Sequence, residues 1–297
     1  MIEVSVVMPT FNRRDSLAVV LPSLAGQDYP KDRYEIILVD NGSTDGTDEL
    51  VKGLGIPNLR HIVQENSGRS GARNRGIREA SGGMVMFTDA DIIAEPDLIS
   101  SHMAFLADRP NSAVVGREVQ VNTLEERDAV KAGTAPERTL HKASKKRLPW
   151  YFFLTGNAAA PKDALIEVGM FDESFTGYGH EDIELGYRLA KAGIPIYYNH
   201  GAVNYHWHPV EFEEQCSKMR LAGISTVRFY NKHRDPEVKL RLGFTPASML
   251  FYGSFSLDGS VMRLCRARKD KSRLCRDIVL QRNYTEGIRE GLRKLGR

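Results

Sequence analysis

Three short apolar runs near the start of the chain each stop at a group of polar residues. The runs are Val4–Met8, Ile36–Val39 and Met84–Phe87, and they are followed by Pro9-Thr10-Phe11-Asn12-Arg13, Asp40-Asn41-Gly42-Ser43-Thr44-Asp45-Gly46 and Thr88-Asp89-Ala90-Asp91. Each run is continuous rather than alternating, which is typical of strands buried on both faces of a parallel sheet. The pattern therefore predicts three buried parallel strands that end in polar residues.

The stretches between these runs have helical character. They are Ser16 to Leu24, Thr47 to Leu54 and Arg69 to Ala80. Alternating strands and helices indicate βαβ units, and in an open parallel sheet the ligand site lies beyond the carboxyl ends of the strands. We therefore expect Asp40, Asp89 and Asp91 to converge on one crevice.

The triplet Asp89-Ala90-Asp91 carries the clearest chemical signal. Carboxylates at the end of a buried strand can hold a hard divalent cation by oxygen ligation, and such a cation can clamp a diphosphate. This points to nucleotide-sugar chemistry. The alternative is that Asp stands at a strand end only because it forms turns and is well solvated.

Six motifs in register resemble the signatures of the family 2 glycosyltransferases. They are Val6-Val7-Met8-Pro9-Thr10-Phe11-Asn12-Arg13, Val39-Asp40-Asn41-Gly42-Ser43-Thr44-Asp45, Gly71-Ala72-Arg73-Asn74-Arg75-Gly76, Thr88-Asp89-Ala90-Asp91, Thr155-Gly156-Asn157 and the segment from Gly177 to Arg188 that contains His180-Glu181-Asp182. The late histidines His206 and His208 continue the match, which covers residues 1 to about 210.

The resemblance implies an α/β protein of the GT-A fold, with a Rossmann-like, mostly parallel twisted sheet flanked by helices. It also implies a nucleotide-diphospho-sugar donor, most often UDP-linked, a divalent metal (Mn²⁺ or Mg²⁺) and inversion at the anomeric carbon. The transferred group would be a hexosyl or N-acetylhexosaminyl unit, as in polysaccharide biosynthesis.

The resemblance also implies roles for individual residues. Asp40 would hydrogen-bond the base, Phe11 would pack near it, Arg73 would approach the nucleotide, Asp89 would face the ribose, Asp91 would bind the metal and Asp182 would be the general base, with Glu181 as the second candidate. We also assign Pro9, Thr10, Asn12, Arg13, Asn66 and Ala90 to the nucleotide site, and Trp150, Gly156 and Asn157 to the acceptor or donor sugar.

Elementary chemistry supports the roles of Asp40 and Arg73 but leaves alternatives open. An Asp can accept the N3 proton of uracil in a charge-assisted hydrogen bond. Asp40 can also cap the turn through Asn41-Gly42-Ser43, and the two roles can coexist. Arg73 offers a planar fork for phosphate or carbonyl groups, and its alternative is a solvated arginine on a helix face.

Asp182 and Glu181 follow the mobile, glycine-flanked loop Gly177-Tyr178-Gly179-His180 and begin a predicted helix. Ile183, Leu185, Leu189 and Ala190 fit its buried side. Acidic residues are favoured in the first turn of a helix because they meet its positive dipole end, which would explain both without chemistry. The same dipole keeps a carboxylate ionised and ready to accept the proton of an acceptor hydroxyl.

His206 and His208 follow Val203-Asn204-Tyr205, which is predicted to be a short strand. Residues at i and i+2 of a strand point to the same side. One of the two is therefore a candidate metal ligand, with His208 preferred. The alternative is an aromatic core corner formed by Tyr205 to Pro209.

Composition is consistent with this interpretation. The chain has 297 residues, of which 41% are hydrophobic, and its length suits one large α/β domain with an appendage. It has no apolar run of ~20 residues, and its N-terminus enters the first strand directly, so we expect neither a transmembrane helix nor a signal peptide. Three cysteines without a CxxC motif indicate a reducing cytosol and no zinc site. We expect a cytoplasmic protein.

The net charge of +3 is unevenly distributed. Residues 263–297 hold twelve basic and four acidic residues, for +8, so the remainder carries −5. The apolar, aromatic stretch Ala247 to Leu257 precedes this segment. Together they suggest peripheral contact with an anionic membrane surface, at the inner face of the cell membrane, where lipid-linked acceptors are found. The alternative is a helical cap with a solvated basic face.

We expect a glycosyltransferase domain over residues 1–210, with a nucleotide-binding half to about 95 and an acceptor-binding half from about 96, and a basic, mainly helical extension over 211–297. The polar segment Lys131–Pro149 is either a lid or acceptor loop, or mobile surface. The partners would be the nucleotide-sugar donor and a saccharide or lipid-linked acceptor, without nucleic acid. A nucleotidyltransferase and a non-catalytic sugar-binding or scaffold protein remain alternatives.

Overall fold

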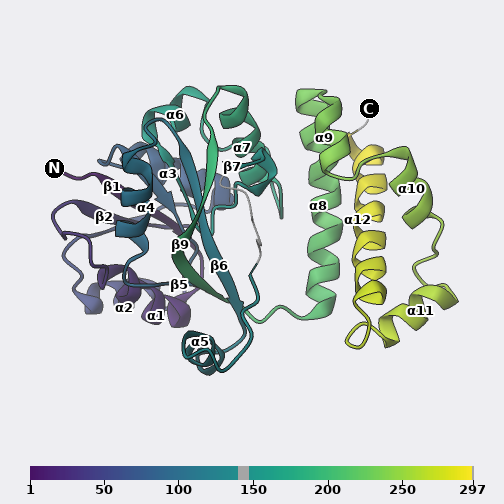
Figure 1. The fold of residues 1–297 in the computed structure, drawn as a ribbon, viewed down its shortest axis with the longest axis horizontal. Coiled ribbons are helices and arrows are strands. Elements are labelled where there is room, and N and C mark those ends of the chain that lie inside the picture. Colours follow the sequence, from purple (N-terminus) through teal and green to yellow (C-terminus); the bar gives the residue numbers. More distant parts are fainter. Residues whose placement is uncertain (140–146, 296–297) are drawn as a thin grey trace. The chain divides into compact units, whose positions relative to one another are not determined.

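The computed structural model describes residues 1–139 and 147–295, and it divides the chain into two compact units. The first unit consists of Met1–Glu173 and Glu181–Pro209, and the second of Ser174–His180 and Val210–Arg297. Figure 1 shows the first unit as a sheet with helices and the second as a group of helices. The chain crosses from one unit to the other three times.

A mixed sheet forms the centre of the first unit. Its strand order is β3-β2-β1-β4-β8-β6-β9-β5, and β7 pairs with β9. The strands are β1 (Val4–Thr10), β2 (Tyr34–Asp40), β3 (Leu59–Val63), β4 (Met84–Phe87), β5 (Ile92–Ala94), β6 (Ala113–Val121), β7 (Arg147–Leu148), β8 (Ala158–Pro161) and β9 (Ile196–Trp207). β1 to β4 are mutually parallel, and β8 is antiparallel to both β4 and β6. β9 has twelve residues, not the short strand expected around Val203, because it pairs with β5, β6 and β7.

The three predicted strands are confirmed, and all residues of β1 and β2 are buried, as their continuous apolar runs require. The helices of this unit are α1 (Arg14–Ala25), α2 (Thr47–Leu54), α3 (Gly68–Glu79), α4 (Leu98–Ala107), α5 (Leu124–Lys131), α6 (Lys162–Glu167) and α7 (Glu181–Lys191), with a 3₁₀ turn at Trp150–Phe152. The first three lie within two residues of the predicted helices. α7 buries Ile183, Leu185 and Leu189, but Ala190 is exposed, so its expected burial was wrong.

Helices also form the second unit: α8 (Phe212–His233), α9 (Pro236–Arg241), α10 (Pro246–Gly253), α11 (Ser260–Ala267) and α12 (Arg273–Leu295). α8 packs along α12. Gly223 and Gly287 permit this close approach, because a Cβ on either would collide with backbone of the other helix. Among the described residues, no helix combines the length and apolarity needed to cross a membrane.

The loop Ser174–His180 belongs to the second unit through its contacts with α8. Phe175 is buried and meets Phe229 edge to face, with 6.4 Å between ring centroids. The Ser225 hydroxyl donates to the carbonyl oxygen of Tyr178 (3.2 Å), and His180 Nε2 lies 2.7 Å from Thr226 Oγ1. These contacts fix the loop to α8 immediately before the chain re-enters the first unit at Glu181. Of the segment Lys131–Pro149, residues 140–146 lie outside the described residues.

Candidate active site

The polar ends of β1 and β2 lie side by side, because Thr10 pairs with Asp40 in the parallel register. Asn12 joins the loops that follow the two strands. Its backbone N–H donates to Ser43 Oγ, and its Oδ1 accepts from the Thr44 N–H, both at 2.8 Å. The loops that follow β1 and β2 are therefore joined, while the expected convergence of Asp40 with Asp89 and Asp91 on one crevice stays a prediction.

Asp40 is buried at this junction. Its Oδ1 accepts hydrogen bonds from the backbone N–H (2.8 Å) and the hydroxyl (2.7 Å) of Ser43, so the turn-capping alternative is realised. Its Oδ2 lies 3.4 Å from Nε2 of His61, a neighbour on β3 that the motifs did not indicate. The contact of Asp40 with a base stays a prediction.

The other residues assigned to the nucleotide surround the same strand ends. Pro9 and Thr10 are buried in β1, Ala90 is buried after β4, and Phe11 and Arg13 are exposed after β1. Asn66 Oδ1 accepts the Gly68 N–H at 3.0 Å, immediately before α3. An exposed phenylalanine beside these polar strand ends offers a surface on which a base can stack.

Arg73 lies on α3 and is 1% exposed, so it is not the solvated helix-face arginine of the alternative interpretation. Its Nη2 donates to Asp89 Oδ1 at 2.7 Å, and its Nη1 lies 3.6 Å from Glu181 Oε1. Burial lowers the pKa of Arg73, but the carboxylates of Asp89, Asp182 and Glu181 outweigh this effect and raise it above its ordinary value. The guanidinium therefore stays charged and connects the Asp89-Ala90-Asp91 triplet to the start of α7.

Glu181 is buried between two arginines. Its Oε1 lies 3.0 Å from Arg69 Nη2 in addition to the Arg73 contact. Burial and the neighbouring Asp182 raise the pKa of Glu181, while Arg69 and Arg73 oppose that rise. This environment suits a carboxylate that positions Arg73.

Asp182 is half-buried at the second position of α7. Its Oδ2 accepts from the hydroxyl of Thr155 at 3.2 Å and more weakly from the Thr155 N–H at 3.4 Å. The Thr155-Gly156-Asn157 segment thus orients Asp182, whereas Glu181 is enclosed by arginines. Of the two candidate bases, Asp182 is the more accessible.

Asp91 is faced by both candidate histidines. His206 Nε2 lies 3.6 Å from Asp91 Oδ1, and His208 Nδ1 lies 3.8 Å from Asp91 Oδ2. The two rings are stacked, with 6.1 Å between their centroids. Burial raises the pKa of Asp91, but His206 outweighs this effect and brings that pKa below its ordinary value. Burial lowers the pKa of His206, but Asp91 and Glu118 outweigh this effect and raise that pKa to about 10.

Glu118 on β6 is a further residue of this cluster that the sequence did not reveal. Its Oε1 lies 3.1 Å from Nδ1 of His206, on the side of the ring away from Asp91. Gln120 lies two residues along the same strand, and its side chain donates to the carbonyl oxygens of His206 and His208, at 3.2 Å each. β6 therefore holds both the ring of His206 and the backbone of the His206–His208 segment.

Of the residues assigned to a sugar, Gly156 lies beside Glu118, whereas Asn157 and Trp150 have other neighbours. Asn204 donates to the Gly156 carbonyl oxygen at 2.8 Å, and a Cβ on Gly156 would collide with the Glu118 carboxylate. Asn157 is buried against His102, whose Nε2 lies 2.8 Å from Asn157 Oδ1. Trp150 is buried and packs edge to face on Tyr187 of α7. None of these placements tests the sugar assignments.

The donor set around Asp91 fits a divalent cation that arrives with a phosphorylated ligand. Carboxylate oxygen suits Mn²⁺ and Mg²⁺, and imidazole nitrogen is a common additional ligand. Within residues 1–139 and 147–295, no cluster of three or more His, Cys, Asp or Glu side chains is arranged to hold a metal by itself. Ions of this kind are commonly bound by one or two carboxylates together with substrate phosphates, so a smaller protein donor set is adequate.

The fold is an α/β fold with acidic residues at the carboxyl ends of its parallel strands, which is where open α/β sheets place their ligand sites. Residues 5–169 match the model of glycosyl transferase family 2, and residues 138–208 match that of the N-terminal domain of galactosyltransferase. Because the first match covers more than half of the chain, the protein belongs to glycosyl transferase family 2, as the motifs predicted.

Known proteins of similar sequence and structure agree with this membership. Validoxylamine A glucosyltransferase of Streptomyces hygroscopicus subsp. jinggangensis is 35% identical over 220 residues, which make up 65% of this chain and 52% of the relative. This chain therefore spans about half the length of that curated relative.

Solved structures confirm the expected GT-A fold. The chain matches TarS 1–349 of S. aureus in complex with UDP with a TM-score of 0.63 and 18% identity, covering 100% of this chain and 92% of that one. It matches the mannosyltransferase PcManGT of Pyrobaculum calidifontis, in complex with GDP-Man and Mn²⁺, with a TM-score of 0.68 and 20% identity, covering 98% and 87%.

Proposed function

We propose that this protein is an inverting glycosyltransferase that moves a sugar from a nucleotide-diphospho-sugar, with UDP as the nucleotide, to an acceptor hydroxyl. The observation that carries the proposal is the buried Arg73, which contacts both Asp89 and Glu181. It places the acidic triplet of the β4 end beside the acidic start of α7. Sugar transfer needs a group that holds the donor diphosphate and a base that deprotonates the acceptor hydroxyl, and the two must lie close to each other.

Residues 1–95 would hold the nucleotide, with Asp40 accepting an N–H of the base, Phe11 stacking near it and Asp89 facing the ribose. Asp91 would hold Mn²⁺ or Mg²⁺ with the help of His206 or His208. A cation at this position supplies positive charge beside the departing diphosphate. Residues 96–210 would bind the sugar and the acceptor, with Trp150, Gly156 and Asn157 close to them.

Asp182 would act as the general base in a single displacement. Its Oδ2, held by Thr155, takes the proton of the acceptor hydroxyl, and the acceptor oxygen forms the new bond to the anomeric carbon. The bond between that carbon and the phosphate oxygen breaks at the same time, and its electron pair leaves with the nucleoside diphosphate. Attack from the face opposite the leaving group inverts the configuration.

The transferred group would be a hexosyl or N-acetylhexosaminyl unit, and the acceptor a saccharide, free or lipid-linked. A lipid-linked acceptor would bring the enzyme into peripheral contact with the inner face of the cell membrane through its basic C-terminal segment. The +8 charge of residues 263–297 supports this part of the proposal, because that leaflet carries anionic lipids.

A thermal-shift panel tests the proposal directly, because a ligand that binds only the folded protein raises its stability by mass action. UDP, GDP, ADP and the corresponding nucleotide sugars would each be measured with Mn²⁺, with Mg²⁺ and with a chelator. We expect the largest rise in Tm with a UDP-linked sugar and metal. Release of UDP from that donor supports glycosyl transfer, whereas release of pyrophosphate on incubation with UTP and a sugar phosphate would support a nucleotidyltransferase instead.

A further inference from the structure

Helix α10 presents an uncharged apolar surface to solvent. None of its eight residues, Pro246–Gly253, is charged. Leu250 is 77% exposed and Phe251 is 56% exposed, and Pro246 and Ala247 of the same helix are also exposed. Phe251 meets the rings of Tyr252 and Phe255, with centroids 5.0 and 5.6 Å apart. Exposed apolar side chains that are grouped on a protein surface mark a site of interaction.

Helix α11 continues this surface and adds positive charge. Met262 and Cys265 point inward and are buried, whereas Val261 and Leu264 are 48% and 50% exposed. The adjoining basic side chains that are exposed are Arg263, Arg268, Lys271 and Arg273. Residues 246–276 hold seven basic and two acidic residues, so their net charge is +5 and positive charge predominates around the apolar positions.

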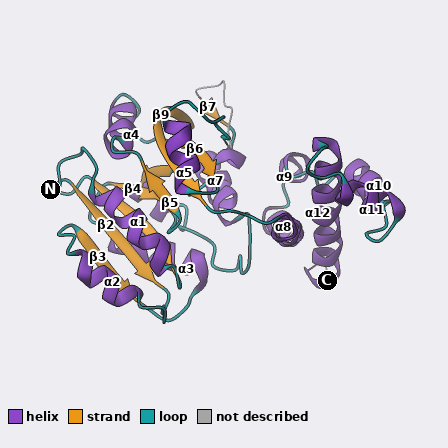
Figure 2. Cartoon of the chain, turned by 90° about the horizontal axis from the view of Figure 1, so that it is seen from below, coloured by secondary structure: helices purple, strands orange, loops and turns teal. Residues whose placement is uncertain are grey.

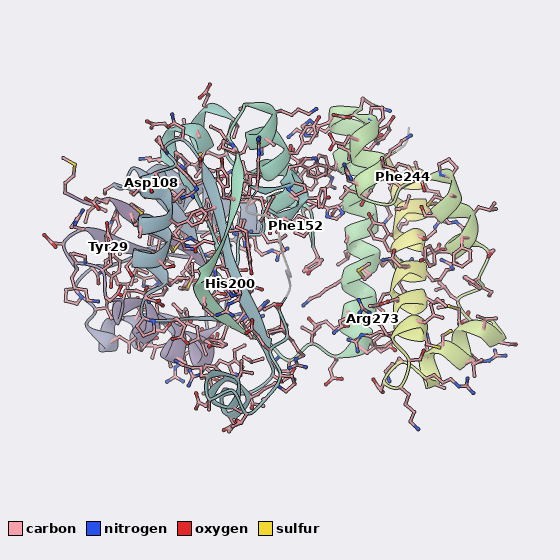
Figure 3. All side chains as sticks on the ribbon, viewed as in Figure 1. Tyr29, Asp108, Phe152, His200, Phe244 and Arg273 are labelled. Atoms are coloured by element: carbon pink, nitrogen blue, oxygen red, sulfur yellow. The ribbon has the colours of Figure 1, made fainter. Side chains whose placement is uncertain are left out.

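The two helices lie on one side of the helical unit. In Figures 1 and 2, α10 and α11 both lie on the side of α12 that faces away from α8. Arg273 stands at the start of α12 (Figure 3), and its side chain is 95% exposed. The exposed apolar and basic side chains of α10 and α11, together with Arg273 at the start of α12, are called the α10–α11 surface below.

Building on the peripheral membrane contact of the proposed function, we propose that the α10–α11 surface is the part of the protein that docks onto an anionic lipid bilayer. Leu250, Phe251 and Leu264 would enter the boundary between head groups and acyl chains, and the surrounding arginines and lysines would pair with lipid phosphates. The positive charge of the surface favours an anionic bilayer over a second copy of the chain as its partner. In a two-fold dimer the same surface of each copy faces the other, so basic residues would be brought against basic residues.

Vesicle flotation tests this proposal without any donor, metal or turnover, so its failure is distinguishable from failure of the proposed transfer reaction. The full chain would be mixed with vesicles of pure phosphatidylcholine or of phosphatidylcholine with phosphatidylglycerol. We expect binding only to the anionic vesicles, and weaker binding as salt rises, because salt screens charge contacts.

Two variants separate the apolar and the basic contributions. Leu250→Asp with Phe251→Asp should abolish flotation, and Arg263→Gln with Arg268→Gln should weaken vesicle affinity by about fivefold for each charge removed. The matched controls are Leu240→Asp, at another exposed leucine of the helical unit, and Arg75→Gln with Arg78→Gln on α3. Both controls should bind as the wild type does, and circular dichroism would verify that every variant is folded.

Equal flotation with neutral and anionic vesicles, or none with either, would overturn the proposal. So would a stable dimer of the wild type that Leu250→Asp converts to a monomer while vesicles bind neither form, since the surface would then join two copies. Loss of flotation in the control variants to the same degree as in the α10–α11 variants would also contradict it.

Discussion

Nδ1 of His206 lies 3.1 Å from Oε1 of Glu118, and Nε2, on the other side of the ring, faces Asp91. A carboxylate in this position keeps the proton on Nδ1 when the ring is neutral, which leaves Nε2 as the acceptor nitrogen available to a metal. Glu118 thereby acts as a positioning residue for His206.

Glu118→Gln should lower the affinity for Mn²⁺ in the presence of UDP by roughly 10–100-fold, the usual effect of losing a partner of a metal-binding histidine. Isothermal titration of Mn²⁺ into the protein with saturating UDP measures it. Glu125→Gln on α5, at an exposed glutamate, is the matched control. Equal Mn²⁺ affinity in both variants would remove Glu118 from the metal site.

Asp91→Ala should abolish the metal-dependent part of UDP binding and of sugar transfer while the protein stays folded, because the substituted side chain contributes the carboxylate of the proposed metal site. Binding of UDP with Mn²⁺ and with a chelator would be compared by titration. Asp108→Ala, at an exposed aspartate labelled in Figure 3, serves as the control and should behave as the wild type. Undiminished metal dependence in Asp91→Ala would refute the metal assignment.

Asp182→Asn should reduce kcat by at least about a hundredfold, because general-base catalysis contributes ~10²–10⁴ in rate. The affinity for UDP should change little, since a base needed only in the transition state does not bind the nucleotide. Steady-state kinetics with saturating donor, together with UDP titration, separate the two effects.

Glu181→Gln is the companion variant. It removes a carboxylate that contacts Arg69 and Arg73, so we expect a lower Tm with kcat affected less than in Asp182→Asn. A large loss of kcat in Glu181→Gln at unchanged Tm, with turnover preserved in Asp182→Asn, would transfer the role of base to Glu181.

His102 should make stability dependent on pH. Burial lowers its pKa from 6.5 to about 4, although its hydrogen bond with Asn157 acts in the opposite direction. Between these two pH values the unfolded chain binds a proton that the native protein does not, so the free energy of unfolding decreases as pH falls from 6.5 to about 4. The full effect is on the order of 3 kcal/mol.

Urea unfolding of the wild type, His102→Gln and His200→Gln between pH 7 and pH 4 measures this dependence. His102→Gln costs stability at pH 7, and its deficit relative to the wild type should shrink as the pH falls. His200 is exposed on β9 (Figure 3), so the difference between His200→Gln and the wild type should change much less. A deficit of His102→Gln that is constant with pH would contradict the buried neutral imidazole.

The sequence was sufficient to predict the first half of the fold. Continuous apolar runs such as Ile36–Val39 define buried parallel strands by themselves, and the polar residues that follow must then meet at one edge of the sheet. Asp91 lies near the two late histidines, as the expected metal site requires, and their role as metal ligands stays a prediction. That prediction depended on the motif resemblance, because Asp91 and the two histidines come from distant segments of the chain.

Residues whose roles depend on strand register were not predictable. Glu118 and His61 reach His206 and Asp40 only because β6 pairs with β9 and β3 with β2 in particular registers. No local pattern marks either residue. The burial of Arg73 was equally hidden, because the arginines of its helix are spaced like solvated ones and only the tertiary fold brings Asp89 and Glu181 to it.

The loop Ser174–His180 has a consequence for how this chain can vary in evolution. It is encoded inside the glycosyltransferase region but packs with the helices that follow residue 209. A gene shortened to end at residue 209 would leave Phe175 without its partner Phe229. Replacing the helices after residue 209 by those of another family member would change the partner of Phe175 in the same way. Substitutions at Phe175 and Phe229, fifty-four positions apart in the sequence, are therefore expected to covary among homologues.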